Sequence, residues 1–270
     1  WGVFALKYLM LKDAHFRRRG ALNLLIHEKT YDLSELARYN LHIHTTFSSC
    51  AKPEMELCSI LQHAEKSNIK TIAITDHFNS RDFRILENNN ELKRQASSCH
   101  NNVKVLYGAE LSAYGVNKYL DSLEINQELD YRLYSYNHYH LDFWEHPSDK
   151  TARGYVKHGI EVLKHLIVSG RADCIAHPFI GRFIKILDDK TLLAKEMTDK
   201  ELGDILELGR NHNVAWEINL GAVLGDPDFA KRYWNIGKEV GVFFHFGTDS
   251  HNLASIDTDK AVEQIRPLLD

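Results

Sequence analysis

The sequence predicts an α/β fold in which seven parallel strands form a distorted, TIM-like (β/α)7 barrel. From about residue 40, short runs rich in β-branched and aromatic residues alternate with longer amphipathic runs. A helix between consecutive strands returns the chain to the same end of the sheet, so the strands run parallel. Each predicted strand also ends in side chains that can bind a metal or carry a proton. Seven strand ends converge on one point most easily if the sheet closes.

The predicted strands are short runs that contain residues typical of buried β-structure, such as Ile72, Ile74 and Ile175. They span residues 40–44, 70–75, 103–110, 132–137, 172–176, 214–219 and 242–247. Residues 1–38 do not fit the alternation, and we predict that they form an N-terminal extension or cap on a barrel domain of residues 39–270. Residues 111–150 are irregular and rich in aromatic side chains.

The predicted helices carry apolar residues at the spacing of one helical face. Leu57, Ile60, Leu61 and Ala64 occupy positions i, i+3, i+4 and i+7 of the first helix. Further helices are predicted over residues 155–169, over 198–212, from residue 226 onward, and over 257–269. Gly170 should end one of them, and a capping box formed by Thr198 and Glu201 should begin the next.

The composition excludes several classes of protein. The 33 basic and 37 acidic residues give a net charge of −4, which argues against stable binding to nucleic acid through its phosphates. No apolar run approaches the roughly 18 residues that span a membrane. The four cysteines form no CxxC pair and the N-terminal segment does not resemble a signal peptide, so we expect a reduced, cytoplasmic protein.

The residues at the strand ends predict a site for several metal ions. His42 and His44 lie two apart on the first strand, so both rings point to the same face. The later strands end near Asp76 and His77, Glu110, His138 and His140, His177, Glu217 and Asn219, and Asp249 and His251. A single histidine is usually a surface residue, but this series at consecutive strand ends predicts a multinuclear centre.

These motifs resemble those of the PHP superfamily, the polymerase and histidinol phosphatase family of metal-dependent phosphoesterases. They are LHIHTTFS at 41–48, IAITDH at 72–77, GAE at 108–110, AHP at 176–178 and GTDSH at 247–251. The resemblance extends over residues 40–260. It implies a distorted seven-stranded barrel, two or three divalent ions of zinc, manganese or iron, and phosphoester hydrolysis.

The resemblance also implies a ligand set. The first ion would be bound by His42, His44, Glu110 and Asp249, the second by Glu110, His138 and His177, and the third by His77 and His251. The Glu110 carboxylate would bridge the first two ions. Where the family has a further third-site ligand, this chain has Ser49-Cys50. Cys50 is a possible thiolate ligand, although we favour a third ion held weakly without it. His140 is an alternative to His138, because a slip of two residues keeps the side chain on the same face.

The implied reaction is hydrolysis of a small phosphomonoester by a metal-bridged hydroxide. Asp76 and Glu217 are the predicted catalytic residues besides the ligands. Asp76 would orient His77, and Glu217, together with Asn219, would position water or substrate at the mouth of the site. Arg182 and Lys185 are candidate contacts to the phosphate of the substrate, and a solvated helix face is the alternative for both.

Three alternatives to a phosphatase were weighed. An exonuclease or nucleotide phosphodiesterase could use the same metal site, with an aromatic residue between Tyr114 and Trp144 stacking on a base. An amidohydrolase also carries HxH on its first strand but normally adds a carboxylated lysine, and no lysine stands at a predicted strand end. The departure at Ser49 keeps open a degenerate, non-catalytic module. We expect a small phosphorylated substrate, without stable partnership with a membrane or nucleic acid.

Overall fold

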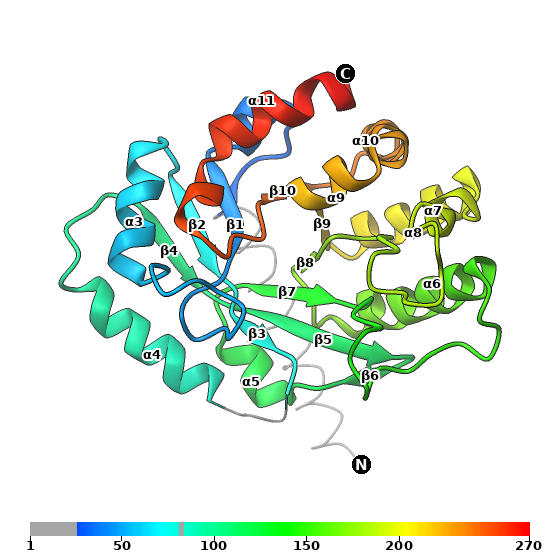
Figure 1. Ribbon diagram of the computed structural model, residues 1–270, viewed down its shortest axis with the longest axis horizontal. Helices are drawn as coiled ribbons and strands as arrows, with labels where there is room; N and C mark the ends of the chain where they lie inside the picture. The colour runs from blue at the N-terminus through cyan, green and yellow to red at the C-terminus, as the bar shows by residue number, and fades with distance from the viewer. Residues whose placement is uncertain (1–25, 81–83) are drawn as a thin grey trace, which may run out of the picture.

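The structure, a computed structural model, describes residues 26–80 and 84–270, which form two sheets of mainly parallel strands with helices on the outside (Figure 1). One sheet has the order β1 (Tyr39–Ile43), β2 (Thr71–Ile74), β4 (Lys104–Tyr107). The other has the order β10 (Phe244–Gly247), β9 (Ala215–Asn219), β8 (Cys174–Ile175), β7 (Arg132–Ser135), β5 (Ala109–Gly115), β3 (His77–Phe78), and β6 (Lys118–Tyr119) pairs antiparallel with β5. The prediction of an α/β fold with parallel strands is confirmed.

The predicted closed barrel of seven strands is not confirmed, because the described strands do not form one continuous sheet. Two predicted strands are interrupted: β2 resumes as β3 after residues 75–76, and β4 resumes as β5 after Gly108. A side chain at Gly108 would collide with the Tyr131 carbonyl, 2.2 Å from the position of a Cβ. At the opposite edge, β1 meets the segment after β10 through an isolated bridge between Ile43 and Ser250 and through hydrogen bonds between Asn40 and Thr248.

The predicted helices are present with shifted ends. They are α3 (Leu57–Lys66), α6 (Ala152–Ser169), α8 (Asp199–Asn211), α10 (Pro227–Val240) and α11 (Thr258–Leu269). Gly170 ends α6 with a φ of 80°, and the capping box of Thr198 and Glu201 is formed. The structure also contains helices that were not predicted: α2 (Leu33–Leu36), α4 (Ile85–Ala96), α5 (Leu123–Glu128), α7 (Leu192–Lys195), α9 (Leu220–Gly225) and the 3-10 helix η1 (Leu253–Ile256).

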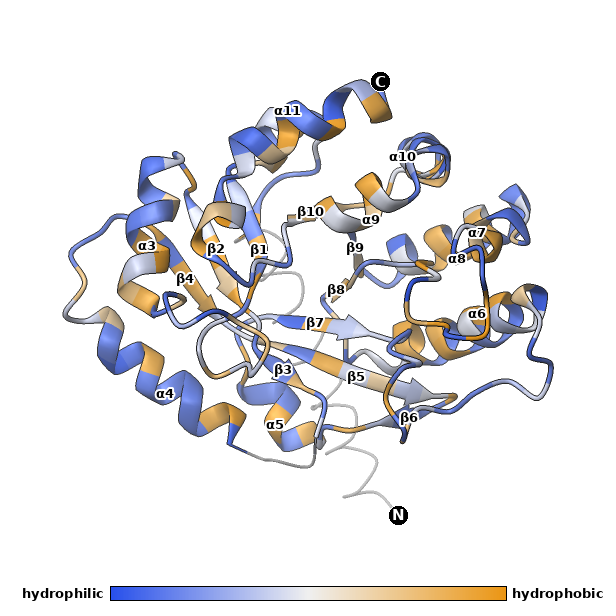
Figure 2. Cartoon of the chain, viewed as in Figure 1, coloured by the Kyte–Doolittle hydropathy of each residue, from blue (hydrophilic) through white to orange (hydrophobic). Residues whose placement is uncertain are grey.

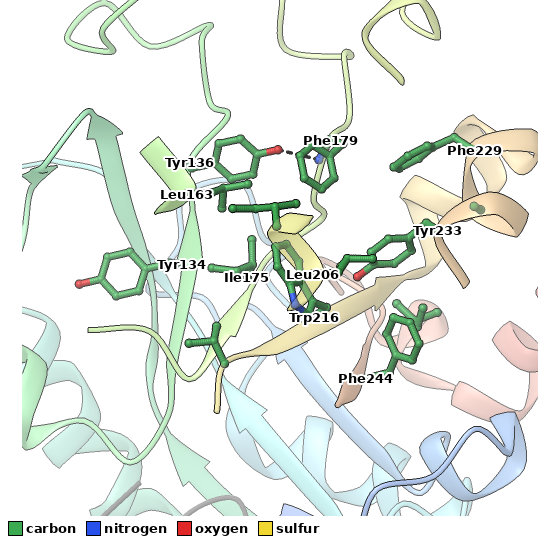
Figure 3. Close-up of a cluster of buried hydrophobic side chains, with 14 of the residues drawn as sticks. Tyr134, Tyr136, Leu163, Ile175, Phe179, Leu206, Trp216, Phe229, Tyr233 and Phe244 are labelled. Atoms are coloured by element: carbon green, nitrogen blue, oxygen red, sulfur yellow. Dashed lines mark hydrogen bonds between the residues drawn. The ribbon is translucent and has the colours of Figure 1, made fainter. Parts of the chain in front are cut away.

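The main apolar core lies between the second sheet and helices α6, α8 and α10, whose ribbons are apolar on one face and polar on the other (Figure 2). Aromatic rings dominate it around Trp216, which stacks on Phe179 at 6.2 Å between ring centroids (Figure 3). The Phe179 backbone N–H donates to the buried Tyr136 hydroxyl at 2.8 Å (Figure 3). The core therefore fixes the segment that directly follows His177.

The N-terminal extension and the cysteines differ in how far the structure tests what was predicted for them. Residues 1–25 of the predicted N-terminal extension lie outside the described residues, whereas Leu33 and Leu36 pack into the main core. The expectation that the cysteines are all reduced is wrong, because Cys58 on α3 and Cys99 after α4 form a disulfide with Cα atoms 5.5 Å apart. Tertiary packing of α3 on α4 brings together two cysteines that are 41 residues apart in the sequence. Among the described helices, none has both the length and the apolar character that crossing a membrane requires.

Candidate metal centre

Most of the predicted ligands lie at or just after the carboxyl ends of the parallel strands, whereas His77 and Glu110 stand at the starts of β3 and β5, just after the ends of β2 and β4. His42 is on β1, His77 on β3 and Glu110 on β5, while the others follow β1, β7, β8 and β10 within four residues: His44, His138, His177, Asp249 and His251. Their donor atoms form three clusters, each within 4.8 Å: His42, His44 and Asp249; Glu110, His138 and His177; His44, His77 and His251. The structure thus brings together all eight predicted ligands.

Glu110 is at the centre of these clusters, and its side chain is 1% exposed. Its Oε1 lies 3.0 Å from Nε2 of His177 and 3.4 Å from Nε2 of His138. Its Oε2 faces the other side, 2.7 Å from Nδ1 of His77 and 3.7 Å from Nε2 of His42. Oε2 makes no hydrogen bond of acceptable geometry with the described residues. A buried anionic oxygen without such a bond is costly unless a cation compensates it.

The electrostatics of the centre favour an ionised carboxylate. Burial alone would raise the pKa of Glu110, but the charge of the His77 ring and hydrogen bonding to His177 and His42 outweigh burial and hold this pKa well below its usual range. Burial lowers the pKa of His138 to about 3, so its ring is neutral near pH 7. A neutral imidazole and an ionised carboxylate are the forms that bind metal ions.

His42, His44 and Asp249 form the second compact group. The Nε2 atoms of His42 and His44 are 3.1 Å apart, and both face Oδ1 of Asp249, at 3.4 and 3.1 Å. Two ring nitrogens and one carboxylate oxygen therefore converge on a small volume, as in the coordination sphere of one ion. Asp249 and His177 both have positive φ, 53° and 27°, and such backbone strain in non-glycine residues concentrates at functional sites.

Glu217 does not lie at the mouth of the site as expected, because its side chain is only 2% exposed and the protein engages both of its oxygens. Oε1 accepts a hydrogen bond from Nδ1 of His42 at 2.8 Å, and Oε2 accepts one from the backbone N–H of His177 at 2.5 Å. A Cβ at Gly247 would lie 2.1 Å from Oε1, so this contact requires glycine at 247. Glu217 therefore links His42 of one cluster to His177 of another through hydrogen bonds.

Asp76 is also buried and holds the loop after β1 rather than the His77 ring. Its carboxylate accepts hydrogen bonds from the N–H and hydroxyl of Thr45 at 2.8 and 2.6 Å and from the Ser48 hydroxyl at 2.6 Å. Ser48 Oγ in turn accepts the His77 N–H at 3.1 Å and lies 3.3 Å from Nδ1 of His44. Thr45 and Ser48 were not predicted as site residues, although both belong to the quoted 41–48 motif.

The third cluster is more open. The His77 and His251 rings each lie 4.3 Å from the His44 ring, and their side chains are 21% and 28% exposed. Partial burial raises the pKa of the Cys50 thiol, but hydrogen bonding to His251 and His77 outweighs burial and lowers this pKa to about 6. The donor atoms that lie within 4.8 Å of one another at this cluster are those of His44, His77 and His251, so a role for the exposed Cys50 as a thiolate ligand stays a prediction.

The remaining predicted residues differ in their distance from the centre. His140 faces Phe183, and His138, which is close to Glu110, is the better placed ligand of the two. Arg182 reaches the centre, with Nη2 3.6 Å from Oδ2 of Asp249. Lys185 is exposed and lines a neighbouring cavity.

Asn219 does not lie at the mouth of the site: it is buried, and its side-chain oxygen caps helix α9 by accepting the Ala222 N–H at 2.9 Å. Its position at the end of β9 could be read from the sequence, but the partners of its amide could not.

Comparisons with known proteins indicate a family and a fold. The family model of the PHP domain matches residues 40–220. A crystal structure of histidinol phosphate phosphatase from Lactococcus lactis subsp. lactis Il1403, in complex with zinc, L-histidinol and phosphate, aligns with a TM-score of 0.59 at 18% identity, covering 85% of this chain and 93% of that one. A protein from Listeria monocytogenes assigned as a histidinol phosphatase aligns with a TM-score of 0.56 at 13% identity, covering 81% and 97%. No curated protein sequence matches the chain.

Proposed function

The chain belongs to the PHP domain family, and from that premise we propose that it is a metal-dependent phosphoesterase that hydrolyses a small phosphomonoester. The observation that carries this proposal is the environment of Glu110. Each oxygen of this buried carboxylate faces a different group of imidazole nitrogens, which is the arrangement that a carboxylate bridging two cations needs.

The described residues fit two divalent ions. His42, His44 and Asp249 would hold one, His138 and His177 the other, and Glu110 would be shared by both. Imidazole and carboxylate donors suit zinc, manganese and iron, and the zinc in the Lactococcus structure makes zinc the first choice. When bound, such ions lower the pKa of water and neutralise charge on phosphoryl oxygens.

The chain's own residues orient this ligand set. By accepting the Nδ1 proton of His42, Glu217 leaves the Nε2 lone pair of that ring directed at the centre. The same carboxylate fixes the His177 backbone. Asp76 accepts the Ser48 hydroxyl proton, and Ser48 Oγ in turn lies beside Nδ1 of His44, so Asp76 helps to orient the His44 ring. We therefore assign Asp76 and Glu217 to positioning of the ligands, not to contact with the substrate.

Arg182 is placed to receive the phosphoryl group. Its side chain is 53% exposed and lies beside Asp249, while the guanidinium packs over the Phe183 ring at 4.6 Å. A guanidinium in this position can pair with two phosphoryl oxygens.

Cys50, His77 and His251 are proposed to hold a third ion at the open side of the centre. A thiolate together with imidazole nitrogens favours zinc over manganese. Because these ligands are partly exposed, we expect this ion to exchange faster than the inner two.

The proposal is tested by assaying the full chain, purified without chelator, on p-nitrophenyl phosphate, L-histidinol phosphate and bis(p-nitrophenyl) phosphate. We expect hydrolysis of the monoesters, loss of activity on chelation, and recovery when zinc or manganese is restored. Preference for the diester would favour the phosphodiesterase alternative. A fully metal-loaded protein that hydrolyses none of these compounds would favour a non-catalytic module.

A further inference from the structure

A cavity of about 420 Å³ opens next to the candidate metal centre, on the side of His138. Its lining residues come from the segment after β7, the start of α6 and the segment between β8 and α7. Its lining includes the cationic or potentially cationic residues His140, His146, Lys150 and Lys185, and one acidic residue, Asp142.

The two lysines in this cavity are available to a ligand. Within residues 26–80 and 84–270, neither ammonium group forms an ion pair. The His146 ring is held by the Tyr155 hydroxyl at 2.8 Å, so it forms a fixed wall of the cavity. Nδ1 of His140 is buried and lacks a hydrogen-bond partner among the described residues. The cavity thus gathers several unmatched donors around a single carboxylate.

Phe183 links this cavity to the metal centre. Its ring lies 4.8 Å from the His138 ring and 4.7 Å from the His140 ring, and these two histidine rings are 5.4 Å apart. A ligand with its phosphoryl group beside His138 can therefore pass over Phe183 and place a second group beside His140 and Lys185. The span suits a linker of a few carbon atoms.

We propose that this cavity binds a second anionic group of the substrate, a carboxylate or another phosphate, and so selects phosphomonoesters of acidic small molecules. The proposal rests on the proposed phosphoesterase function for the position of the first phosphoryl group. Lys185 and Lys150 supply positive charge, and Nδ1 of His140 adds a polar atom without a hydrogen-bond partner among the described residues. Opposite charges in a partly enclosed site favour the anion over a neutral group of equal size.

Matched ligands that differ only in the second anion test this selectivity. For turnover, we would compare kcat/KM for 3-phosphoglycerate and glycerol 3-phosphate, and for fructose 1,6-bisphosphate and fructose 6-phosphate. The two pairs distinguish a carboxylate from a phosphate. For binding without turnover, we would compare the Kd values of 4-phosphonobutanoate and its neutral amide, 4-phosphonobutanamide, by calorimetry. Each measurement is made on the wild type, on Lys185→Gln, and on Lys231→Gln, which removes an exposed lysine of α10.

We expect the wild type and Lys231→Gln to prefer the doubly anionic member of a pair by about tenfold or more, and Lys185→Gln to lose most of this preference. Equal Kd values for the two phosphonates in the wild type, or a preference that Lys185→Gln retains, would overturn the subsite. Absence of turnover together with a preference for 4-phosphonobutanoate over its amide that depends on Lys185 would instead overturn the proposed function and leave the anion site standing.

Discussion

The inner and outer parts of the candidate metal centre are held in different ways. The inner ligands have side chains at most 14% exposed, and those of His42, Glu110 and His177 are at most 2% exposed. Glu217 orients His42 and the His177 backbone through hydrogen bonds, and the aromatic core holds Phe179, two residues after His177. The outer group, Cys50, His77 and His251, is partly exposed. Its residues interact with one another through hydrogen bonding of Cys50 with His251 and His77. This comparison indicates that burial of the ligands and the hydrogen bonds that orient them, as well as donor type, determine how tightly each ion binds. The inner ions should therefore bind more tightly than the outer one.

Replacing the shared carboxylate should have the largest effect. Glu110→Gln keeps the side-chain volume but removes the negative charge that both inner groups of ligands face. Because metal ions supply several kcal/mol of transition-state stabilisation, we expect kcat/KM on a phosphomonoester to fall roughly 10²- to 10³-fold or more. Steady-state kinetics on p-nitrophenyl phosphate measure this fall. Activity within a few-fold of wild type would remove Glu110 from the centre.

His138 and His140, two residues apart, provide a matched pair of substitutions for the next largest effect on activity. His138→Ala removes a ring 3.4 Å from Glu110, and should reduce kcat/KM about 10²-fold, with loss of one inner ion. His140→Ala removes a ring that faces Phe183, and should keep both inner ions. Kinetics and elemental analysis of both variants test this difference. The reverse pattern would mean that His140 is the ligand.

Substitution of Glu217 tests whether its hydrogen bonds to His42 and to the His177 backbone strengthen binding of the inner ions. Glu217→Gln can still accept the His42 proton with its amide oxygen, but it loses its charge and the second acceptor for the His177 N–H. We expect a fall of roughly 10- to 100-fold in inner-ion affinity or activity, as for other groups that orient metal ligands. Titration of the chelated protein with zinc measures the affinity. The control Glu263→Gln changes an exposed carboxylate on α11 and should behave as wild type.

The outer group should give the smallest change in turnover. Cys50→Ser removes the proposed thiolate, so the third ion should bind less tightly while kcat/KM at saturating metal changes less than about tenfold. In cobalt-loaded protein, a near-ultraviolet thiolate-to-cobalt charge-transfer band should be present in wild type and absent in Cys50→Ser. Cys50→Asp offers a carboxylate and should restore binding without the band. No such band in the wild type would show that Cys50 is not a ligand.

Local patterns in the sequence predicted much of the fold. Apolar spacing and the capping residues Thr198, Glu201 and Gly170 predicted the long helices, because these signals act within one or two turns. The interruption at Gly108 and the disulfide between Cys58 and Cys99 were missed, since both depend on segments that meet only in the folded chain. The closed barrel was expected because seven strand ends point to one site, but the breaks after β2 and β4 allow the same convergence without a continuous sheet.

The candidate ligands were predictable for a related reason. Alternation on a strand and the parallel arrangement place residues such as His42, Glu110 and His177 at one end of the sheets. The roles of Glu217 and Asn219 were assigned less well, because the sequence gives their strand ends but not the partners of their polar atoms. The same limit applies to Ser48, whose importance comes from the contacts of a single hydroxyl.

The metal content of the purified chain tests the central claim most directly. Wild-type protein and Glu110→Gln, both prepared without chelator and dialysed extensively at neutral pH, would be compared by elemental analysis for zinc, manganese and iron. We predict that the wild type keeps two ions per chain, that any third ion is removed by dialysis, and that Glu110→Gln loses at least one inner ion. A wild-type protein that dialysis leaves without metal, or a Glu110→Gln variant with the same inner-ion content as wild type, would contradict a centre built on Glu110.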